Sequence, residues 1–111
     1  MKDRNAKSYI RSLVGKNLKR IRSLQNISQM ELSGRAGLST NFINEIEQQK
    51  KGISFDTLSK LSLALNVEPY EFFLPEEITN DITQLYITSI RNNVQRAVNE
   101  ATDPYLKKKG K

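Results

Sequence analysis

The feature that most constrains this chain is a helix-start signal that recurs four times between residues 27 and 72. In each copy, a residue able to cap a helix follows directly after an apolar residue, and a second apolar residue stands four positions beyond the cap. Such an apolar pair forms a hydrophobic staple, which fixes where the chain enters the helix. The four copies are Ile27/Leu32 around Ser28, Leu38/Ile43 around Ser39, Ile53/Leu58 around Ser54 and Val67/Phe72 around Glu68. They predict four successive short helices, near 28–36, 39–48, 54–65 and 69–74.

Helical periodicity continues on both sides of these four segments. Before them, apolar residues at steps of three and four predict an amphipathic helix over 8–24. After Pro75, a similar stripe predicts a long helix over 78–101, which we expect Asp103-Pro104 to end. The expected breaks between the shorter helices fall at Gly37, Gly52 and Asn66. No strand-turn-strand pattern is visible, so the sequence predicts an all-α fold.

The residue types that are missing narrow the possible functions. The chain contains no cysteine and no histidine, and therefore no disulfide, no thiolate ligand and none of the usual nitrogen ligands of zinc. Its five glycines form no phosphate-binding loop, and no serine or lysine has a plausible base beside it. We expect no enzyme activity, no cofactor and no metal. No apolar run is long enough to span a bilayer or to form a signal peptide, so we expect a cytoplasmic protein that does not bind membranes.

The charges are distributed unevenly along the chain. Residues 1–60 carry twelve Lys/Arg and five Asp/Glu, whereas residues 61–101 carry two and six. The last ten residues add four lysines and one aspartate, which gives the whole chain a net charge of +6. A basic half followed by an acidic segment favours a polyanion as the partner of one region and a different contact for the other. An ordinary solvated surface is the alternative.

The second and third predicted short helices carry the candidate functional site. Residues 29–48, QMELSGRAGLSTNFINEIEQ, join them by a turn of about three residues, and helices joined in this way cross closely. Ser33, Ala36 and Gly37 provide the small side chains and the flexible backbone that the crossing requires. If the apolar residues face the core, the outer face of the later helix consists of Thr40, Asn41, Asn44, Glu45 and Gln48. Such a polar face suits the reading of base edges in the major groove of double-stranded DNA. A merely solvated helix surface is the alternative.

Residues Val14 to Phe73 resemble the Cro/repressor (XRE) family of helix-turn-helix DNA-binding proteins. The resemblance is carried by the segments VGKNLKRIR, ISQMEL, AGLSTNFINEIE and SFDTLSKLSLALNVEPYEFF. It implies an all-α, five-helix lambda-repressor-like domain followed by an additional C-terminal helix. It also implies a sequence-specific transcriptional regulator, which we expect to be a repressor.

The resemblance further implies roles for individual residues. Thr40, Asn41 and Glu45 occupy the base-reading positions, and we add Asn44 from the same face. Contacts to the DNA backbone are expected from the cap Ser39 and from Gln29, Gln48, Lys50 and Lys51, and Gln29 would also support the third helix. Arg20 and Glu47 would form a partly buried salt bridge between the first and third helices. Lys16, Lys19 and Arg22 are expected on the outer face of the first helix.

Some positions depart from the family pattern. Gln49 stands where the family has a glycine that ends the third helix in the left-handed conformation. Either Gln49 adopts that conformation, at a cost of roughly 1 kcal/mol, or the helix runs further. Ser33 replaces an alanine and Ile53 replaces a proline. These changes affect the loop after the third helix more than they affect the fold.

The segment after Pro75 lies beyond the family resemblance. Because its apolar stripe has no evident partner in the preceding domain, we predict a two-fold homodimer on a palindromic operator. The predicted contacts are Ile82, Leu85, Tyr86, Ile90, Val94 and Val98. The predicted organisation is a DNA-binding domain over 1–75, an oligomerisation helix over 76–103 and a basic, disordered tail over 104–111. Two alternatives stay open. The helix folds back on its own domain, or it binds another protein, as in an antitoxin-like module that uses its helix-turn-helix for autoregulation.

Overall fold

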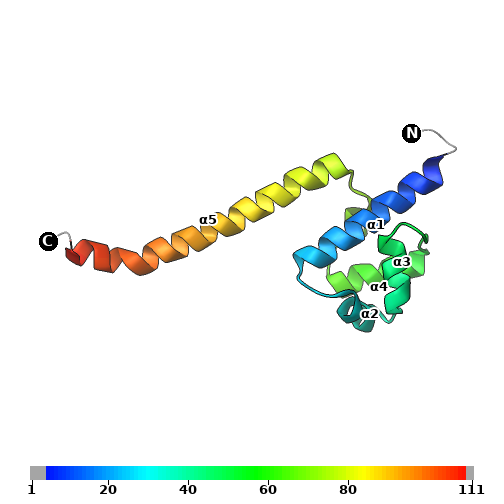
Figure 1. Cartoon of the computed structure of the whole chain (residues 1–111), viewed down its shortest axis with the longest axis horizontal. Coiled ribbons are helices and arrows are strands. Elements are labelled where there is room, and N and C mark those ends of the chain that lie inside the picture. The colour runs from blue at the N-terminus through cyan, green and yellow to red at the C-terminus, as the bar shows by residue number, and fades with distance from the viewer. Residues whose placement is uncertain (1–4, 110–111) are drawn as a thin grey trace. The chain divides into compact units, whose positions relative to one another are not determined.

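The computed structural model describes residues 5–109 of the chain, and within them every regular element is helical (Figure 1). The elements are α1 (Ala6–Leu24), α2 (Gln29–Ala36), α3 (Thr40–Glu47), α4 (Phe55–Leu65), the 3₁₀ helix η2 (Pro69–Phe73) and α5 (Glu76–Lys109). The chain divides into two compact units, Met1–Pro75 and Glu76–Lys111, which are described separately below. The predicted all-α fold is confirmed.

The short helices begin at the predicted caps. The hydroxyls of Ser28, Ser39 and Ser54 each accept a hydrogen bond from the backbone amide three residues later, at 3.0 to 3.1 Å. At the start of η2, the backbone amide of Glu68 donates to the carboxylate of Glu71 at 3.0 Å. A serine cap contributes about 1 kcal/mol of stability, because it satisfies an amide that has no partner within the helix. The local sequence therefore fixes where these helices start.

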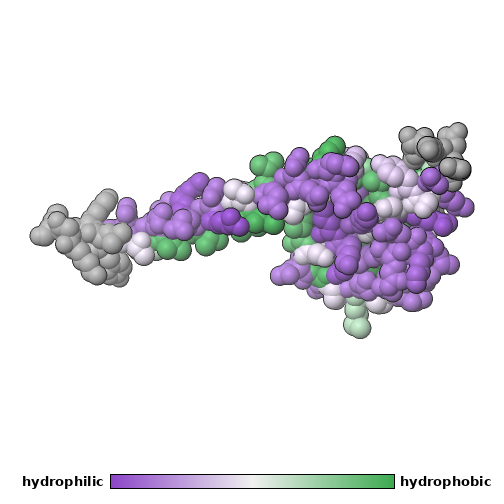
Figure 2. Space-filling view, turned by 45° about the horizontal axis from the view of Figure 1, so that its top comes forward, coloured by the Kyte–Doolittle hydropathy of each residue, from purple (hydrophilic) through white to green (hydrophobic). Residues whose placement is uncertain are grey.

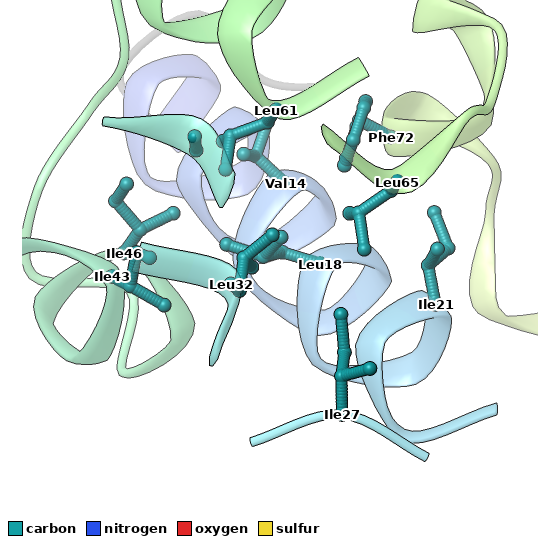
Figure 3. Close-up of a cluster of buried hydrophobic side chains, with 11 residues drawn as sticks. Val14, Leu18, Ile21, Ile27, Leu32, Ile43, Ile46, Leu61, Leu65 and Phe72 are labelled. Atoms are coloured by element: carbon teal, nitrogen blue, oxygen red, sulfur yellow. The ribbon is translucent and has the colours of Figure 1, made fainter. Parts of the chain in front are cut away.

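Apolar side chains from five elements form one core in the first unit (Figure 3). α1 packs against α3 and η2, and α2 packs against α3 and α4. The most deeply buried large side chains come from all five elements and are Leu18, Leu32, Ile43, Ile46, Leu61, Leu65 and Phe72. Burying a side chain of this size contributes about 1.5–3 kcal/mol. Every staple residue named above lies in this core or packs against it, so the same residues that start the helices also hold them together.

A close approach of α1 and α3 depends on Gly15. A Cβ atom at this position would lie 2.5 Å from the carbonyl oxygen of Ile46 and 3.2 Å from that of Glu47. No side chain fits there without moving the backbone of α3. Gly15 therefore lets the end of α3 rest directly on α1.

Asn17 joins α1 to the end of the first unit. Its side chain is buried, and its Nδ2 group donates to the carbonyl oxygens of Leu13, Phe72 and Leu74 at 2.8, 3.0 and 3.0 Å. The last two bonds satisfy carbonyl groups at the end of η2. One buried amide thus holds η2 against α1.

The helix α5 is longer than predicted. It contains 34 residues, which corresponds to a length of about 51 Å at 1.5 Å per residue. The predicted end at Asp103-Pro104 is wrong, because the helical backbone continues to Lys109. A proline lacks one backbone donor but has a φ compatible with a helix, so it does not compel the helix to stop. Residues 104–109 are accordingly helical, residues 110–111 lie outside the described residues, and the disorder predicted for this tail stays a prediction.

The apolar side chains of α5 are exposed along the helix. Figure 2 shows hydrophobic residues along it, bordered by hydrophilic ones. The exposed members are Ile78, Ile82, Leu85, Tyr86, Ile87, Ile90, Val94 and Val98. No helix among the described residues, α5 included, combines the length and the apolar character needed to cross a membrane.

Candidate nucleic-acid interface

The turn between α2 and α3 is short and internally hydrogen-bonded. α2 ends at Ala36, and Gly37 follows with a φ of 68°, in the left-handed region that glycine adopts most readily. The backbone amides of Gly37 and Leu38 both donate to the carbonyl oxygen of Ser33, at 3.0 and 3.2 Å. Ser39 then caps α3. This arrangement is a helix-turn-helix in which α3 is the second helix.

A buried ion pair anchors the inner face of α3. The Nε and Nη2 groups of Arg22 donate to the two carboxylate oxygens of Glu47, at 2.6 and 3.0 Å. The Nη1 group of Arg22 also donates to the carbonyl oxygen of Ile27 at 2.8 Å. The Glu47 side chain is 3% exposed and that of Arg22 is 14% exposed. Hydrogen bonding to Glu47 raises the pKa of Arg22, although burial acts in the opposite direction. A bidentate pair of this kind fixes the orientation of α3 relative to α1.

The prediction that Arg20 forms a salt bridge with Glu47 is therefore wrong. Glu47 pairs with Arg22, whereas Arg20 donates from Nε and Nη2 to the Asn17 Oδ1 atom, at 3.4 and 3.2 Å. Burial lowers the pKa of Arg20, and the nearby Glu71 carboxylate opposes that effect. Arg22 follows the buried Leu18 by four residues, so it continues the inward face of α1. For the same reason, the prediction that Arg22 lies on the outer face of the first helix is wrong.

Gln29, the first residue of α2, links this ion pair to the polar side of α3. Its Nε2 group donates to Glu47 Oε1 at 3.1 Å and to Asn44 Oδ1 at 3.2 Å. Asn44 Oδ1 also accepts from the Nε2 group of Gln48, at 3.4 Å. The resulting network connects α1, α2 and α3 through side chains alone. Gln29 thus supports α3 as predicted, while its contact with DNA stays a prediction.

The outer face of α3 consists of the five predicted polar residues, of which Asn41 and Gln48 are exposed and the others half-buried. The Nδ2 group of Asn41 donates to Glu45 Oε1 at 3.0 Å, so an amide and a carboxylate are oriented together. The Oγ1 atom of Thr40 lies 2.9 Å from Ser33 Oγ in α2. Amide and carboxylate groups presented on one helix face match the donor and acceptor patterns of base edges.

A left-handed residue follows the C-cap of α3. Gln49 has a φ of 66°, and the backbone amide of Lys50 donates to the carbonyl oxygen of Glu45 at 2.9 Å. Of the two conformations considered for Gln49, the left-handed one is observed. Lys50 and Lys51 follow and are exposed, and Lys51 Nζ lies 4.0 Å from Glu45 Oε2. An exposed pair at that separation is weak, so both ammonium groups remain available to an anion next to α3.

The side chains on this surface can form hydrogen bonds and ionic contacts with a ligand. Over residues 5–109, no group of three or more Asp, Glu, His or Cys side chains could hold a metal ion. The site instead offers amide, hydroxyl, carboxylate and ammonium groups. Groups of these types contact nucleic-acid bases and phosphates directly.

A family model described as a helix-turn-helix domain matches residues 15–78, which covers α1 from Gly15 to the start of α5. The chain belongs to this helix-turn-helix family. A curated member, the HTH-type transcriptional regulator y4dJ of Sinorhizobium fredii, is 31% identical to it over 70 residues, or 63% of this chain and 91% of the relative. Control protein C.BamHI of Bacillus amyloliquefaciens is 38% identical over 61 residues, or 54% of this chain and 75% of the relative.

A solved helix-turn-helix structure is also similar. The restriction-modification controller protein C.AhdI from Aeromonas hydrophila matches with a TM-score of 0.55 and 28% identity, over 57% of this chain and 96% of the controller protein. The family match and these relatives together identify the chain as a DNA-binding transcriptional regulator of the Cro/repressor (XRE) type, as its sequence predicts.

The structure brings most of the predicted site residues of this regulator together around α3. Arg20 lies apart from them, bonded to Asn17. Sequence analysis did not find the packing roles of three residues: Gly15 and Arg22, which position α3, and Asn17, which holds η2 against α1. Two of them carried a usable signal: Asn17 and Arg22 are polar residues at three- and four-residue steps from the buried Val14 and Leu18. A polar residue within an apolar stripe is typical of a buried hydrogen-bonding group.

Proposed function

We propose that this regulator reads its operator in the major groove with the outer face of α3. The observation that supports the proposal is the buried network beneath that face, in which Arg22, Glu47 and Gln29 hold α3 from the inner side. Asn41 and Glu45 bond to each other outside this network, whereas Thr40 and Asn44 of the same face also bond to Ser33 and Gln29 of α2. Asn41 and Glu45 contact base edges, because an amide can bond adenine bidentately and a carboxylate can accept from the cytosine amino group. Thr40 and Asn44 complete the base-reading set.

The groups around α3 contact the sugar-phosphate backbone in this proposal. Gln29 lies at the N-terminus of α2, where backbone amides and the helix dipole favour an anion. The Ser39 hydroxyl accepts from the Phe42 amide and keeps its own proton for a phosphate oxygen. Gln48, Lys50 and Lys51 are exposed at the other end of α3. Contacts at both ends of the helix fix its register on the duplex, which base contacts alone do not.

We further propose that α5 joins two copies of the chain. Along the helix, large apolar side chains are 42–71% exposed at the predicted contact positions Ile82, Leu85, Tyr86, Ile90, Val94 and Val98. A second α5 covers such a stripe with an identical one and forms a two-fold interface. A two-fold dimer places two recognition helices about 34 Å apart, one turn of DNA, and therefore selects a palindromic operator. We expect the bound dimer to act in the cytoplasm as a repressor that occludes its operator.

Selection from random duplexes tests the reading of DNA. The full chain is incubated with a pool of random double-stranded sequences, and the bound fraction is amplified and sequenced over several rounds. The proposal expects convergence on one motif whose two halves are inverted repeats. Convergence on a single half-site would contradict the dimer, and retention of DNA without any convergence would contradict sequence-specific reading.

A pair of matched substitutions tests the role of α5 in the full chain. Leu85→Glu places a carboxylate in the apolar stripe, whereas Gln84→Glu adds the same charge at the neighbouring exposed polar position. Sedimentation velocity is expected to show a dimer for the parent and for Gln84→Glu, and a monomer for Leu85→Glu. A monomeric parent contradicts the dimer. A parent that is monomeric alone but co-purifies with one stoichiometric protein through Leu85 supports the antitoxin-like alternative instead.

A further inference from the structure

A cavity of about 270 Å³ opens in the first unit, away from the outer face of α3. It lies between the first two turns of α1, the loop after α3, the start of α4 and the end of η2. Its lining includes the apolar side chains of Ile10, Val14, Ile53, Phe55, Leu58 and Phe73. Among them, Phe55 is 91% exposed, so the apolar lining continues onto the open surface. The cavity is therefore an apolar surface that the described residues leave uncovered.

The charged groups around this cavity all have one sign. Its lining contains Lys7, Arg11 and Lys51 but no aspartate or glutamate. The Nε atom of Arg11 is enclosed, yet it has no hydrogen-bond partner among the described residues. It lies 3.7 Å from the point where a Cβ atom would project from Gly52, so it is held against the loop that follows α3. A buried donor without an acceptor destabilises a protein by about 1–3 kcal/mol. Because the Arg11 side chain also lines the cavity, turning its guanidinium toward an acceptor there would relieve that cost.

We propose that this cavity binds a small monocarboxylate with an apolar body. An apolar cavity of about 150 Å³ can hold a benzene molecule, so this larger one accommodates a phenylalkyl group or an acyl chain of similar bulk. The carboxylate accepts from Arg11 and is attracted by Lys7 and Lys51. A second protein is a poorer occupant, because stable protein interfaces bury about 800 Å² on each partner and this cavity offers only a few side chains.

Occupancy of this cavity opposes DNA binding, a consequence that rests on the proposed function. Lys51 belongs both to the cavity lining and to the proposed phosphate contacts after α3. Among the described residues, its Nζ atom pairs with the Glu45 carboxylate at 4.0 Å, a weak contact that a stronger anion can replace. A ligand carboxylate that draws Lys51 into the cavity removes it from the DNA backbone. By linkage, DNA then weakens ligand binding by the same factor.

Ligand binding is tested first, on the full chain without DNA. The probe is 4-phenylbutyrate, and its matched uncharged control is 4-phenylbutanol. Calorimetry is expected to give an affinity for the acid at least about tenfold above that for the alcohol, the effect of one charge-assisted hydrogen bond. In amide NMR spectra, the largest shifts are expected at Gly52, Ile53 and Leu58. Equal affinities for acid and alcohol, or shifts centred on another part of the chain, overturn the proposal.

Two charge substitutions locate the carboxylate. Arg11→Gln is expected to lower the affinity for the acid about tenfold and to leave that for the alcohol unchanged. Lys19→Gln, which removes an exposed positive charge of α1 outside the cavity, is expected to change neither. An equal loss from both substitutions shows a general charge effect and overturns the site. A change of sedimentation coefficient in Arg11→Gln identifies a second copy of the chain as the occupant and also overturns it.

The coupling to DNA is tested with a short duplex of mixed sequence at low salt, because phosphate contacts do not require an operator. Saturating 4-phenylbutyrate is expected to weaken duplex binding by about fivefold, near the lower end of typical couplings between sites. Lys51→Gln is expected to abolish this response. Unchanged duplex binding overturns the coupling. Failure of the selection experiment would instead overturn the proposed function, and ligand binding measured without DNA does not depend on that result.

Discussion

The two units of this regulator use their apolar side chains in opposite ways. In residues 5–75, side chains such as Leu18 and Ile46 are fully enclosed by residues of neighbouring helices. In α5, side chains of the same kind face solvent, with Leu85 71% exposed and Val94 57% exposed. The first unit therefore contains the partners of its own helices. We infer that α5, and likewise the outer face of α3, finds its partners in other molecules. Substitutions of buried residues in the first unit should therefore change stability, and substitutions in α5 or on the outer face of α3 should change binding.

The largest expected effect is on stability, and it distinguishes a buried leucine of the first unit from an exposed leucine of α5. Leu32→Ala removes a fully buried side chain of α2 and leaves a cavity, so we expect it to lower the free energy of unfolding by about 2–5 kcal/mol. Leu85→Ala deletes the same atoms from α5, and we expect it to weaken self-association while changing the unfolding of the first unit by less than about 0.5 kcal/mol. Urea denaturation followed by circular dichroism at low protein concentration measures the first effect, and sedimentation equilibrium measures the second. A comparable loss of stability from both substitutions would break the comparison.

The next effect tests whether the buried polar network is as important to the first unit as its apolar core. Arg22→Ala leaves the Glu47 carboxylate enclosed with only Gln29 as a bonded partner, so we expect a loss of about 2–4 kcal/mol. Arg20→Ala removes bonds to Asn17 at 3.2 and 3.4 Å and should cost less, about 1 kcal/mol. Lys19→Ala, at an exposed position, serves as the control. Equal midpoints of thermal unfolding for the Arg22 and Arg20 variants would contradict the observed pairing.

These positions also show how far the sequence alone determines this structure. Caps and staples predict the starts of the short helices because Ser28, Ser39 and Ser54 each bond to the backbone amide only three residues later in the sequence. The pairing of Glu47 depends on which arginine of α1 meets the end of α3, and that is set by the packing of two helices. The close contact at Gly15 arises in the same way.

The end of α5 could not be predicted for a different reason. Proline disfavours the interior of a helix by about 3 kcal/mol, but it does not forbid it, and neighbouring turns decide the outcome. The expected end at Asp103-Pro104 gave that preference too much weight, and the helix continues to Lys109. For the outer face of α3, by contrast, helical periodicity was sufficient. Once Ile43 and Ile46 face inward, Asn41, Glu45 and Gln48 lie on the opposite face, whereas Glu47 lies beside Ile43 and Ile46 and is buried.

The outer face of α3 should behave like α5, in that its substitutions change binding and not folding. We expect Asn41→Ala and Glu45→Ala to leave the unfolding midpoint almost unchanged and to reduce discrimination at one or two base pairs, by about 1–3 kcal/mol for each lost contact. Lys50→Ala and Lys51→Ala should weaken binding to all sequences alike. Each should also lower the slope of log affinity against log salt by about one unit. The measurement is binding to the selected duplex and to single-base variants of it over a range of salt concentrations. If the lysine variants altered base preference and the Asn41 variant did not, the assignment of base contacts to Asn41 and of phosphate contacts to the lysines would be wrong.

The smallest expected effect concerns Gln49, which among the described residues of the first unit is the one with a positive φ that is neither glycine nor asparagine. Gln49 has a φ of 66°, a region that costs a residue with a Cβ atom roughly 1–2 kcal/mol. Asn26 and Asn66 also have positive φ, but asparagine tolerates this conformation. Gln49→Gly removes the strain and gives the unfolded chain more entropy, so we expect a net stabilisation of only about 0.5 kcal/mol. Gln48→Gly is the matched control, because its φ of −82° strains no residue, and it should destabilise by about 0.5–1 kcal/mol. Midpoints of urea denaturation, measured in parallel, are expected to rise for Gln49→Gly and to fall for Gln48→Gly. A loss of stability in Gln49→Gly would show that the side chain, whose Cγ atom packs over Gly15, contributes more than its backbone strain costs, and would add Gln49 to the contacts that hold α3 on α1.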